Sequence, residues 1–415
     1  MASVTPPRGM RDFTPAVKAQ RERVLSRIRA SYRAHGFDEI ETPVVEEAAR
    51  LSAGLGGDNE KLAFGILKRG LTPEDLAAAN STDDLIDMGL RYDLTVPLTR
   101  FYATNRAELP PVFRAIQIAP VWRAERPQKG RFRQFVQCDI DTIGEAGILA
   151  EVEILTATLA TLDSLGVAGT TIRLNDRRIL LGLLDSLGLT ETESALITLD
   201  KLDKIGAKGV LDELKERGAS DSALATLGEL IARHSTPTAA PTLDAMTDAL
   251  PAGIAPQAVA ELADIARAVG HAGRIIFDPF LVRGMGYYTG AIFEVAHAEL
   301  GYSLGGGGRY DGMIGRFLGT DVPAVGISLG FERLVELVAD TDPENNDSVA
   351  VIYDPELSVD ELITVKNTLL AEGLRVRLVQ KTKNTRAVLE QLDRDGFSRY
   401  SFLNSGESLE WKTLG

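Results

Sequence analysis

The feature that most constrains the fold is a strict alternation of side-chain types over residues 131–141, which predicts an extended strand with two different faces. One face is mostly apolar and would pack on a core, since it carries Phe132, Gln134, Val136, Cys138 and Ile140. The opposite face is a row of functional groups with one aromatic ring among them: Arg131, Arg133, Phe135, Gln137, Asp139 and Asp141. We therefore expect this strand to form part of a floor of fixed polar side chains above a core.

The preceding residues 121–125 repeat the pattern, because Arg123 and Glu125 share one face. Residues 126–130 form a basic, turn-rich segment, so we expect two antiparallel strands joined by a cationic loop. Arginine forks suit phosphate oxygens, an aromatic ring suits stacking on a flat base, and carboxylates suit an ammonium or an imidazole. The combination indicates a nucleoside triphosphate beside a small cationic metabolite. The alternative, a solvated strand face, gains nothing from a phenylalanine among arginines.

Composition restricts the classes of protein to which this chain can belong. The 415 residues suffice for about two or three domains, and 44% hydrophobic with 25% charged residues is typical of a globular protein. No apolar run is long enough to span a bilayer, and the N-terminal residues lack the apolar centre of a signal peptide. The single cysteine excludes an internal disulfide, and four widely spaced histidines argue against a zinc site. We expect a cytoplasmic protein with no protein-held metal. The net charge of −14 argues against nonspecific coating of nucleic acid but not against local basic patches.

Residues 121–141 (VWRAERPQKGRFRQFVQCDID) resemble motif 2 of the class II aminoacyl-tRNA synthetases, in the form that histidyl-tRNA synthetases carry. Other motifs of that family follow in family order along nearly the whole chain. The resemblance implies an α+β catalytic domain, with an antiparallel sheet flanked by helices, a helical insertion and a C-terminal α/β anticodon-binding domain. The expected boundaries are 1–176 and 270–338 for the catalytic domain, 177–269 for the insertion, 339–347 for a linker and 348–415 for the C-terminal domain.

Residues 90–100 (LRYDLTVPLTR) resemble the amino-acid-binding loop of this family. The resemblance implies that Asp93 and Thr95 accept hydrogen bonds from the substrate ammonium, although many members carry Glu where Asp93 stands. The alternative role for Thr95 is that of N-cap to a helix that begins at Val96.

Residues 281–295 (LVRGMGYYTGAIFEV) resemble the signature R-G-L-D-Y-Y, which marks histidyl-tRNA synthetases. In that family the arginine binds the α-phosphate and a tyrosine contacts the imidazole, which implies these roles for Arg283 and Tyr288, with Tyr287 beside them. The chain departs from the signature at Gly286, where the family usually has Asp. The alternative is a pair of core tyrosines beside a salt-bridged arginine.

Two further stretches resemble family motifs. Residues 303–318 contain four consecutive glycines and resemble the second histidine-specific signature; such a run allows backbone to approach a flat ligand. Residues 324–337 resemble motif 3, whose arginine binds the γ-phosphate, which implies that role for Arg333. The alternative for Arg333 is an exposed surface residue. The helix and strand expected over residues 18–45 resemble motif 1, the dimer-interface motif of the family.

Together these motifs imply a histidine–tRNA ligase that uses ATP with Mg²⁺, L-histidine and tRNA(His) and works as a homodimer. The implied catalytic residues are Arg123 and Arg283. The implied ATP-binding residues are Arg123, Glu125, Arg131, Phe135, Arg283 and Arg333. The implied histidine-binding residues are Asp93, Thr95, Gln137, Asp141, Tyr287 and Tyr288. One alternative is a non-catalytic, histidine-sensing regulatory subunit of ATP phosphoribosyltransferase, which usually lacks the C-terminal domain and the motif arginines. Another is a class II synthetase for a different amino acid.

Overall fold

The structure is a computed structural model that describes residues 4–55, 62–128, 130–234, 238–239, 242–270, 273–283, 286–339, 348–405 and 408–414. The chain divides into two compact units. The first comprises Met1–Arg11 and Leu25–Val338, and the second comprises Asp12–Val24 and Ala339–Gly415. Lys129 and residues 340–347 of the expected linker lie outside the described residues.

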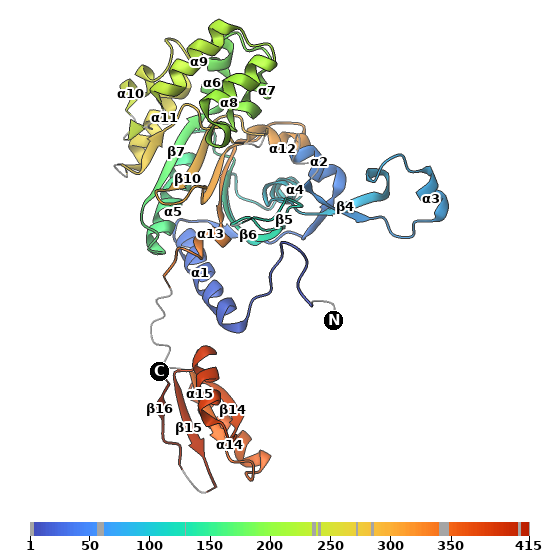
Figure 1. Ribbon diagram of the computed structural model, residues 1–415, viewed down its shortest axis with the longest axis vertical. Helices are drawn as coiled ribbons and strands as arrows, with labels where there is room; N and C mark the ends of the chain where they lie inside the picture. Colours follow the sequence, from blue (N-terminus) through green and yellow to red (C-terminus); the bar gives the residue numbers. More distant parts are fainter. Residues whose placement is uncertain are drawn as a thin grey trace. The chain divides into compact units, whose positions relative to one another are not determined.

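The first unit is built on a nine-stranded sheet (Figure 1). In spatial order its strands are β1 (Asp38–Glu39), β5 (Phe113–Trp122), β6 (Gln134–Ile143), β12 (Ala324–Gly330), β11 (Gly305–Arg309), β10 (Ala291–His297), β7 (Thr170–Asp176), β9 (Ile275–Phe277) and β8 (Thr238–Ala239). The pairs β1–β5 and β7–β9 are parallel, and the other neighbours are antiparallel. The predicted antiparallel sheet flanked by helices is confirmed, with one parallel pair toward each edge.

Strand β6 has the two faces that the alternation predicts. Cys138 and Ile140 are fully buried in the core, where the Tyr32 hydroxyl donates to the Cys138 carbonyl at 3.3 Å. The strand pair is shorter than expected, because β5 ends at Trp122 and β6 begins at Gln134. The intervening segment folds back through the Arg123 amide, which donates to the Arg133 carbonyl at 2.9 Å. The motif arginines before β6 therefore lie in the connecting segment rather than on the strands.

Several helices pack around this sheet, and a small second sheet adjoins it. The helices are α1 (Pro15–Ala34), α2 (Ala48–Leu55), α4 (Thr95–Asn105), α5 (Leu149–Ser164), α12 (Asp311–Leu318) and α13 (Phe331–Leu334). The second sheet has the order β2 (Val45–Glu47), β4 (Ile86–Leu90), β3 (Phe64–Leu67), with α3 (Pro73–Ala78) and a 3₁₀ turn (Asp83–Leu85) between β3 and β4. Helix α5 matches the apolar segment of the sequence, since Ile154, Leu155 and Leu159 are fully buried.

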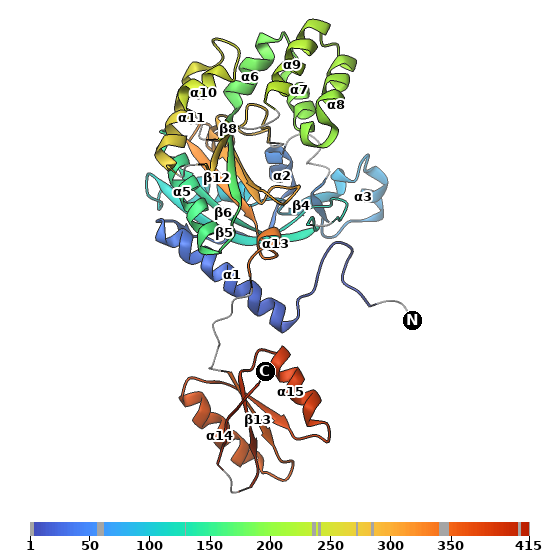
Figure 2. The same cartoon turned by 60° about the vertical axis from the view of Figure 1, so that its left-hand side comes forward.

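The helices expected over residues 177–269 are present, and both views show them gathered beside β7 (Figures 1 and 2). They are α6 (Arg177–Ser186), α7 (Thr192–Leu199), α8 (Leu202–Glu216), α9 (Asp221–Arg233), α10 (Leu243–Asp248) and α11 (Pro256–Val269). Side-chain caps begin three of them, because Asp176 accepts from the Arg178 amide, Ser220 from the Ala223 amide and Thr242 from the Ala245 amide. Whether this segment is a domain with the predicted boundaries stays a prediction.

The second unit contains the predicted β-α-β-α-β succession. Its elements are β13 (Ser348–Tyr353), α14 (Val359–Ala371), β14 (Arg375–Gln380), α15 (Thr385–Arg394), β15 (Arg399–Leu403) and β16 (Lys412–Thr413). The strand order is β14-β13-β15-β16, and β13 is parallel to both β14 and β15. Buried Val349 and Val351 pack with Leu362 and Leu369 of α14, while Ile352 packs with the cluster that includes α15. The sheet is therefore covered on both faces, as expected for parallel strands.

Candidate active site

A cavity of about 1320 Å³ opens in the first unit, and all twelve predicted site residues line it. They come from five separate parts of the chain: Asp93 and Thr95 at the start of α4; Arg123, Glu125 and Arg131 between β5 and β6; Phe135, Gln137 and Asp141 on β6; Arg283, Tyr287 and Tyr288 before β10; and Arg333 on α13. The fold therefore brings the predicted residues together, and their individual roles stay predictions.

The guanidinium group of Arg123 lies between two aromatic rings. Its Cζ is 4.3 Å from the centroid of the Tyr92 ring and 5.0 Å from that of Phe135, and its Nε donates to the Tyr92 carbonyl at 3.2 Å. Ring faces attract a cation and leave its N–H groups at the edge free to reach an anion. Arg123 is therefore oriented by its neighbours without being neutralised by a carboxylate in these contacts.

Arg333 is held by main-chain oxygens and by an aromatic ring. Its Nε donates to the Gly130 carbonyl at 3.2 Å, its Nη1 donates to the Ser303 carbonyl, and its Cζ lies 4.8 Å from the centroid of the Tyr302 ring. Burial lowers the pKa of Arg333, and the positive charges of Arg131, Arg283 and Arg123 lower it further. Four guanidinium groups thus repel one another in one cavity, an arrangement that an anion with several charges would relieve.

Arg131 and Glu125, which both line the cavity, form an ion pair. The Arg131 Nη1 to Glu125 Oε2 distance is 2.9 Å, but the pair lacks the geometry of a hydrogen bond. Glu125 Oε2 is therefore a buried acceptor that has no hydrogen-bond partner among the described residues. Arg131 is the more exposed partner, with 46% of its side chain accessible.

The carboxylate of Asp141 lies in an enclosed, polar part of the cavity. Its Oδ1 accepts a hydrogen bond from the Tyr310 hydroxyl at 2.7 Å. Burial raises the pKa of Asp141 to about 7, opposed by the Tyr310 hydrogen bond and supported by the negative charge of Asp93. Gly326 on the neighbouring strand makes this position possible, because a Cβ there would lie 1.8 Å from Asp141 Oδ1. Burial, followed by the charge of Asp141, also raises the pKa of Asp139 well above its usual value.

Asp93 and Gln137 each keep one acceptor atom unused. Asp93 Oδ1 accepts from the Val96 amide at 3.1 Å, and Gln137 Nε2 donates to Ser328 Oγ at 2.6 Å. Asp93 Oδ2 and Gln137 Oε1 are buried and have no hydrogen-bond partner among the described residues. An unsatisfied buried acceptor costs free energy, so both atoms suit a ligand that brings N–H donors.

The alternative N-cap role of Thr95 is wrong. Helix α4 begins at Thr95, and the carboxylate of Asp93 accepts from the Val96 amide instead. The Thr95 side chain forms a hydrogen bond with Tyr287, which lines the same cavity. One oxygen of Asp93 therefore caps the start of α4, and the other oxygen has no hydrogen-bond partner among the described residues.

Tyr287 and Tyr288 form an aromatic wall beside the acidic groups. Their ring centroids lie 4.8 Å apart in an edge-to-face arrangement, and the Tyr287 centroid lies 6.1 Å from that of Tyr310. Burial raises the pKa of all three hydroxyls, so they remain protonated at neutral pH and can donate hydrogen bonds. Both tyrosines line the cavity and both are also buried, and Arg283 forms an ion pair with Glu294, as the alternative of core tyrosines beside a salt-bridged arginine expected.

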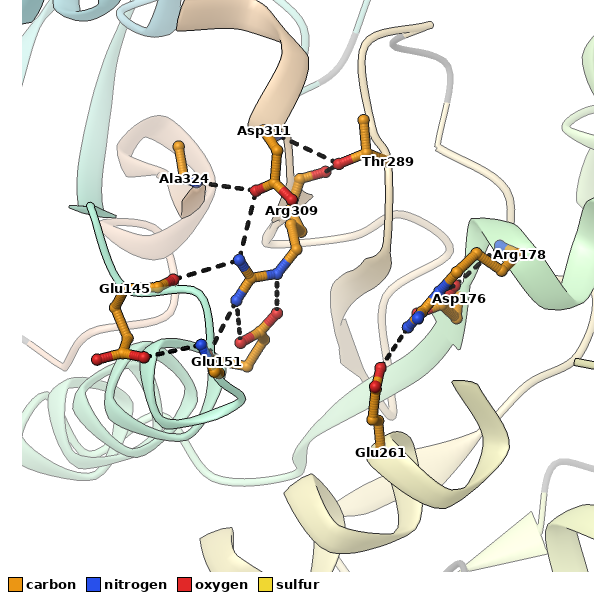
Figure 3. Close-up of polar contacts among 10 residues, drawn as sticks. Glu145, Glu151, Asp176, Arg178, Glu261, Thr289, Arg309, Asp311 and Ala324 are labelled. Carbon is orange, nitrogen blue, oxygen red and sulfur yellow. Dashed lines mark hydrogen bonds and ion pairs between the residues drawn. The ribbon is translucent and has the colours of Figure 1, made fainter. Parts of the chain in front are cut away.

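An ion-pair cluster fixes the end of the glycine strand that forms one wall (Figure 3). Arg309 donates to both oxygens of Glu151, at 2.6 and 2.7 Å, and Asp311 accepts from the Ala324 amide at 2.9 Å. Burial lowers the pKa of Arg309, but its hydrogen bonds to Glu151 outweigh this effect and raise it. The cluster joins β11, α5 and β12, and it therefore holds the wall in place.

Sequence reasoning did not assign four residues that contribute to the cavity: Tyr302, Tyr310, Ser328 and Glu294. Tyr310 is separated from the glycine run by Arg309 alone, so its position could have indicated a role. Ser328 and Glu294 carried no local signal, because their importance depends on which strands are neighbours. Asp139 stood on the predicted polar face of β6 and lines the cavity as that face predicts.

Two negative observations apply to the described ranges of the chain. No group of three or more His, Cys, Asp or Glu side chains there could hold a metal ion. None of the helices in these ranges is both long and apolar enough to cross a membrane.

Comparison with known proteins adds independent information. A family model described as histidyl-tRNA synthetase matches residues 9–334. The chain is 58% identical to the histidine–tRNA ligase of Leifsonia xyli subsp. xyli (strain CTCB07), over 98% of this chain and 96% of that relative. It is 42% identical to a probable histidine–tRNA ligase of Tropheryma whipplei (strain Twist), over 97% of this chain and 96% of the relative.

Two solved structures share the fold. The crystal structure of histidyl-tRNA synthetase from Nostoc sp. PCC 7120 has a TM-score of 0.78 at 26% identity, covering 100% of this chain and 95% of that one. A crystal structure titled as an ATP phosphoribosyltransferase regulatory subunit/histidyl-tRNA synthetase from Bacillus halodurans has a TM-score of 0.74 at 21% identity, covering 96% of this chain and 97% of that one. The second likeness concerns the fold alone.

Proposed function

Because this chain belongs to the histidyl-tRNA synthetase family, we propose that its cavity carries out both steps of a histidine–tRNA ligase. The enzyme is an aminoacyl-tRNA synthetase that uses ATP to join L-histidine to tRNA. In the first step a histidine carboxylate oxygen attacks the α-phosphorus of ATP, the bond to the bridging oxygen breaks, and pyrophosphate leaves. In the second step the terminal ribose hydroxyl of tRNA(His) attacks the carbonyl carbon of histidyl-adenylate, and AMP leaves.

Neither step needs a protein nucleophile, so the protein contributes position and charge. The observation that carries the proposal is the content of one cavity, in which the four assigned arginines accompany buried carboxylates with oxygens that have no hydrogen-bond partner among the described residues. Fixed guanidinium groups stabilise the negative charge that develops on the phosphates during attack. Buried acceptors orient the ammonium of the amino acid and thereby align its carboxylate.

The arginines are assigned to different parts of the triphosphate. Arg123 and Arg283 neutralise the α-phosphate, while Arg131 and Arg333 hold the γ-phosphate. Among the neighbouring positive charges that lower the pKa of Arg333, that of Arg131 has the largest effect, which supports placing these two at the same phosphate. Phe135 stacks on the adenine ring, and Glu125 Oε2, which has an ion-pair contact with Arg131 but no hydrogen-bond partner among the described residues, accepts from the adenine amino group.

Histidine occupies the acidic part of the cavity. Asp93, Thr95 and Gln137 take the α-ammonium, and the unpaired oxygens of Asp93 and Gln137 support this assignment. Asp141 and Tyr288, with Tyr287 beside them, bind the imidazole. An Asp141 carboxyl that titrates near neutrality can either donate to or accept from a ring nitrogen, which suits an imidazole that titrates in the same range.

Mg²⁺ would enter with ATP. The described residues offer no group of three or more acidic, histidine or cysteine side chains that could hold a metal ion, so they do not fit a dedicated metal cage. Mg²⁺ commonly binds phosphate oxygens and water, with few protein ligands, and would supply further charge neutralisation.

The remaining assignments concern partners and location. The helices within residues 177–269 and the C-terminal α/β unit would contact tRNA, and the strand and helix around residues 18–45 would contribute to a homodimer interface. The single cysteine fits a reducing cytoplasm. The regulatory-subunit alternative is less well supported, because the catalytic arginines and the C-terminal unit are both present.

Histidine-dependent exchange of pyrophosphate into ATP tests the proposal. We expect exchange with histidine and no comparable exchange with the other standard amino acids, followed by charging of tRNA(His). Exchange with a different amino acid would identify a synthetase of other specificity. Histidine binding without exchange, in protein that is correctly folded, would favour the regulatory subunit.

A further inference from the structure

One row of side chains crosses four strands next to the cavity. The register places Arg173 on β7 opposite Glu294 on β10, Glu294 opposite Gly306 on β11, and Gly306 opposite Ser328 on β12. Residues opposite one another in a sheet point to the same face. The side chain of Arg283, from the segment before β10, reaches this row and meets Glu294 and Gly306 there.

Glu294 connects two arginines. Arg283 Nη1 donates to Glu294 Oε2 at 2.8 Å, and Arg173 Nη1 donates to Glu294 Oε1 at 2.9 Å. Each oxygen of the carboxylate therefore has a different guanidinium partner. Because the negative charge is shared, Arg283 is held in place and still has positive charge available for an anion.

Gly306 provides the space that the Arg283 guanidinium occupies. A Cβ at Gly306 would lie 2.5 Å from Arg283 Cζ, which is too close for a carbon–carbon contact. The adjacent Gly307 differs, because a Cβ there would lie 1.9 Å from the Gly326 carbonyl oxygen, in the backbone of β12. The first conflict involves the end of a long side chain, whereas the second involves the sheet itself. Gly307 is therefore required by the close packing of the sheet, whereas Gly306 leaves space for the Arg283 guanidinium.

Other residues fix Arg173, the second partner of Glu294. Arg173 Nε donates to Asp278 at 2.7 Å, and its Nη1 lies 3.4 Å from Asp203 of α8. These acids, together with Glu294, raise the pKa of Arg173 despite its burial. Arg173 cannot leave Glu294 without breaking contacts to two other carboxylates. The Glu294 carboxylate is consequently anchored from the side opposite to Arg283.

We propose that Glu294 and the side-chain-free position at Gly306 are positioning elements that hold the Arg283 guanidinium ready for the α-phosphate. This inference rests on the proposed function, in which Arg283 stabilises charge during adenylate formation. Glu294 acts only through Arg283 and does not touch the substrate. By analogy with groups that orient metal ligands, such a positioning residue is expected to contribute about tenfold to a hundredfold to activity.

The first test replaces Glu294 by glutamine and measures kcat and KM in histidine-dependent pyrophosphate exchange. Glu294→Gln should lower kcat by about tenfold to a hundredfold, with little change in the KM for histidine, because the pocket for the amino acid is retained. The matched control is Asp264→Asn on α11, which removes the carboxylate of a surface ion pair with Arg267 at the same distance of 2.8 Å. This control should retain wild-type kinetics.

A double-mutant cycle separates positioning from a general structural effect. If Glu294 acts through Arg283, Glu294→Gln should change activity by no more than about twofold when it is added to Arg283→Ala. A full and independent loss in the Arg283→Ala background would overturn the proposal. Residual exchange of the Arg283→Ala variant has to be measured at high enzyme concentration for this comparison.

Substitutions in the glycine run give a second test. Gly306→Ala should leave the melting temperature close to that of the wild type and lower kcat, since the new methyl group displaces the Arg283 side chain. Gly307→Ala should lower the melting temperature or prevent folding. Gly312→Ala is the matched control, because a Cβ there would meet nothing within 4 Å. If Gly306→Ala fails to fold, the cycle with Glu294 still decides the question.

Different results would contradict the proposed function and the positioning of Arg283. A wild-type protein without histidine-dependent exchange would contradict the proposed function. A wild-type protein with exchange, whose Glu294→Gln and Gly306→Ala variants retain its kcat, would contradict only the positioning of Arg283.

Discussion

The Tyr310 hydroxyl donates a hydrogen bond of 2.7 Å to Asp141 Oδ1 inside the cavity. Tyr310 comes directly after strand β11, and Asp141 is the last acidic residue of the predicted polar face on β6. Burial raises the pKa of both groups, but only Asp141, with a pKa of about 7, titrates near neutral pH. The pair therefore links the charge of the proposed imidazole site to pH.

The stability of the protein should depend on the titration of Asp141. Its folded-state pKa of about 7 exceeds its unfolded value of 3.8, so the folded state binds more protons between these two pH values. The free energy of unfolding that Asp141 contributes should accordingly fall as pH rises from about 4 to about 7. The free energy of unfolding of Asp141→Asn, relative to that of wild type, should increase by up to about 4 kcal/mol across this pH range. Urea unfolding at a series of pH values measures the difference.

Tyr310→Phe provides the matched control for this titration. The Tyr310 hydrogen bond lowers the pKa of Asp141, so its removal should move the pH-dependent loss of stability to higher pH. A stability difference between wild type and Asp141→Asn that stays constant from pH 4 to pH 8 would contradict the assigned titration.

Arg283→Ala should lower the rate of adenylate formation. The loss of one fixed charge at the reacting phosphate is expected to cost about 3 kcal/mol in activation free energy, by analogy with the loss of one oxyanion donor. Histidine-dependent pyrophosphate exchange reports this step. The control is Arg267→Ala, which removes an arginine whose side chain is 76% exposed on α11. Near-normal exchange by Arg283→Ala would rule out the proposed role.

Arg11→Ala should destabilise the first unit. Arg11 forms an ion pair with Glu332, whose exposure is 4%, and the Arg11 Cζ lies 3.5 Å from the centroid of the Phe132 ring. Removal of the cation takes a charged hydrogen-bond partner from a buried carboxylate that also accepts from the Val136 amide, which is expected to cost about 2 kcal/mol of unfolding free energy. Glu332→Gln in the same chain should restore part of the loss, because the buried charge is then absent. Equal stability of Arg11→Ala and wild type would contradict the argument.

Gly286→Asp should be tolerated by the fold. A Cβ at Gly286 would meet nothing within 4 Å, so the unfolding free energy should stay within about 0.5 kcal/mol of wild type. We expect a lower KM for histidine, because the variant supplies the carboxylate that histidyl-tRNA synthetases usually carry at this position. Gly286→Asn, which has a similar size and no charge, should leave the KM unchanged. Thermal unfolding and pyrophosphate exchange give the two readouts, and an equal effect of both variants would exclude a role for the charge.

The sequence by itself determined the local parts of this protein. The two-residue period of 131–141 identified β6 and its polar face, because side chains on a strand alternate between the two faces. Apolar spacing and breaks identified the helices over 177–269 and the α/β succession near the C-terminus. The resemblance of several short motifs to a known family also predicted residues that line one cavity, although they are far apart along the chain.

Tertiary structure alone decided the contacts between those parts. Strand β12 lies between β6 and β11, which puts Gly326 against Asp141 and Ser328 beside Gln137. Glu294 reaches Arg173 because β10 lies next to β7, and no nearby sequence signal reports that pairing. The physical reason is that periodicity and capping act over a few residues, whereas strand order and register depend on hydrogen bonds and packing between distant segments.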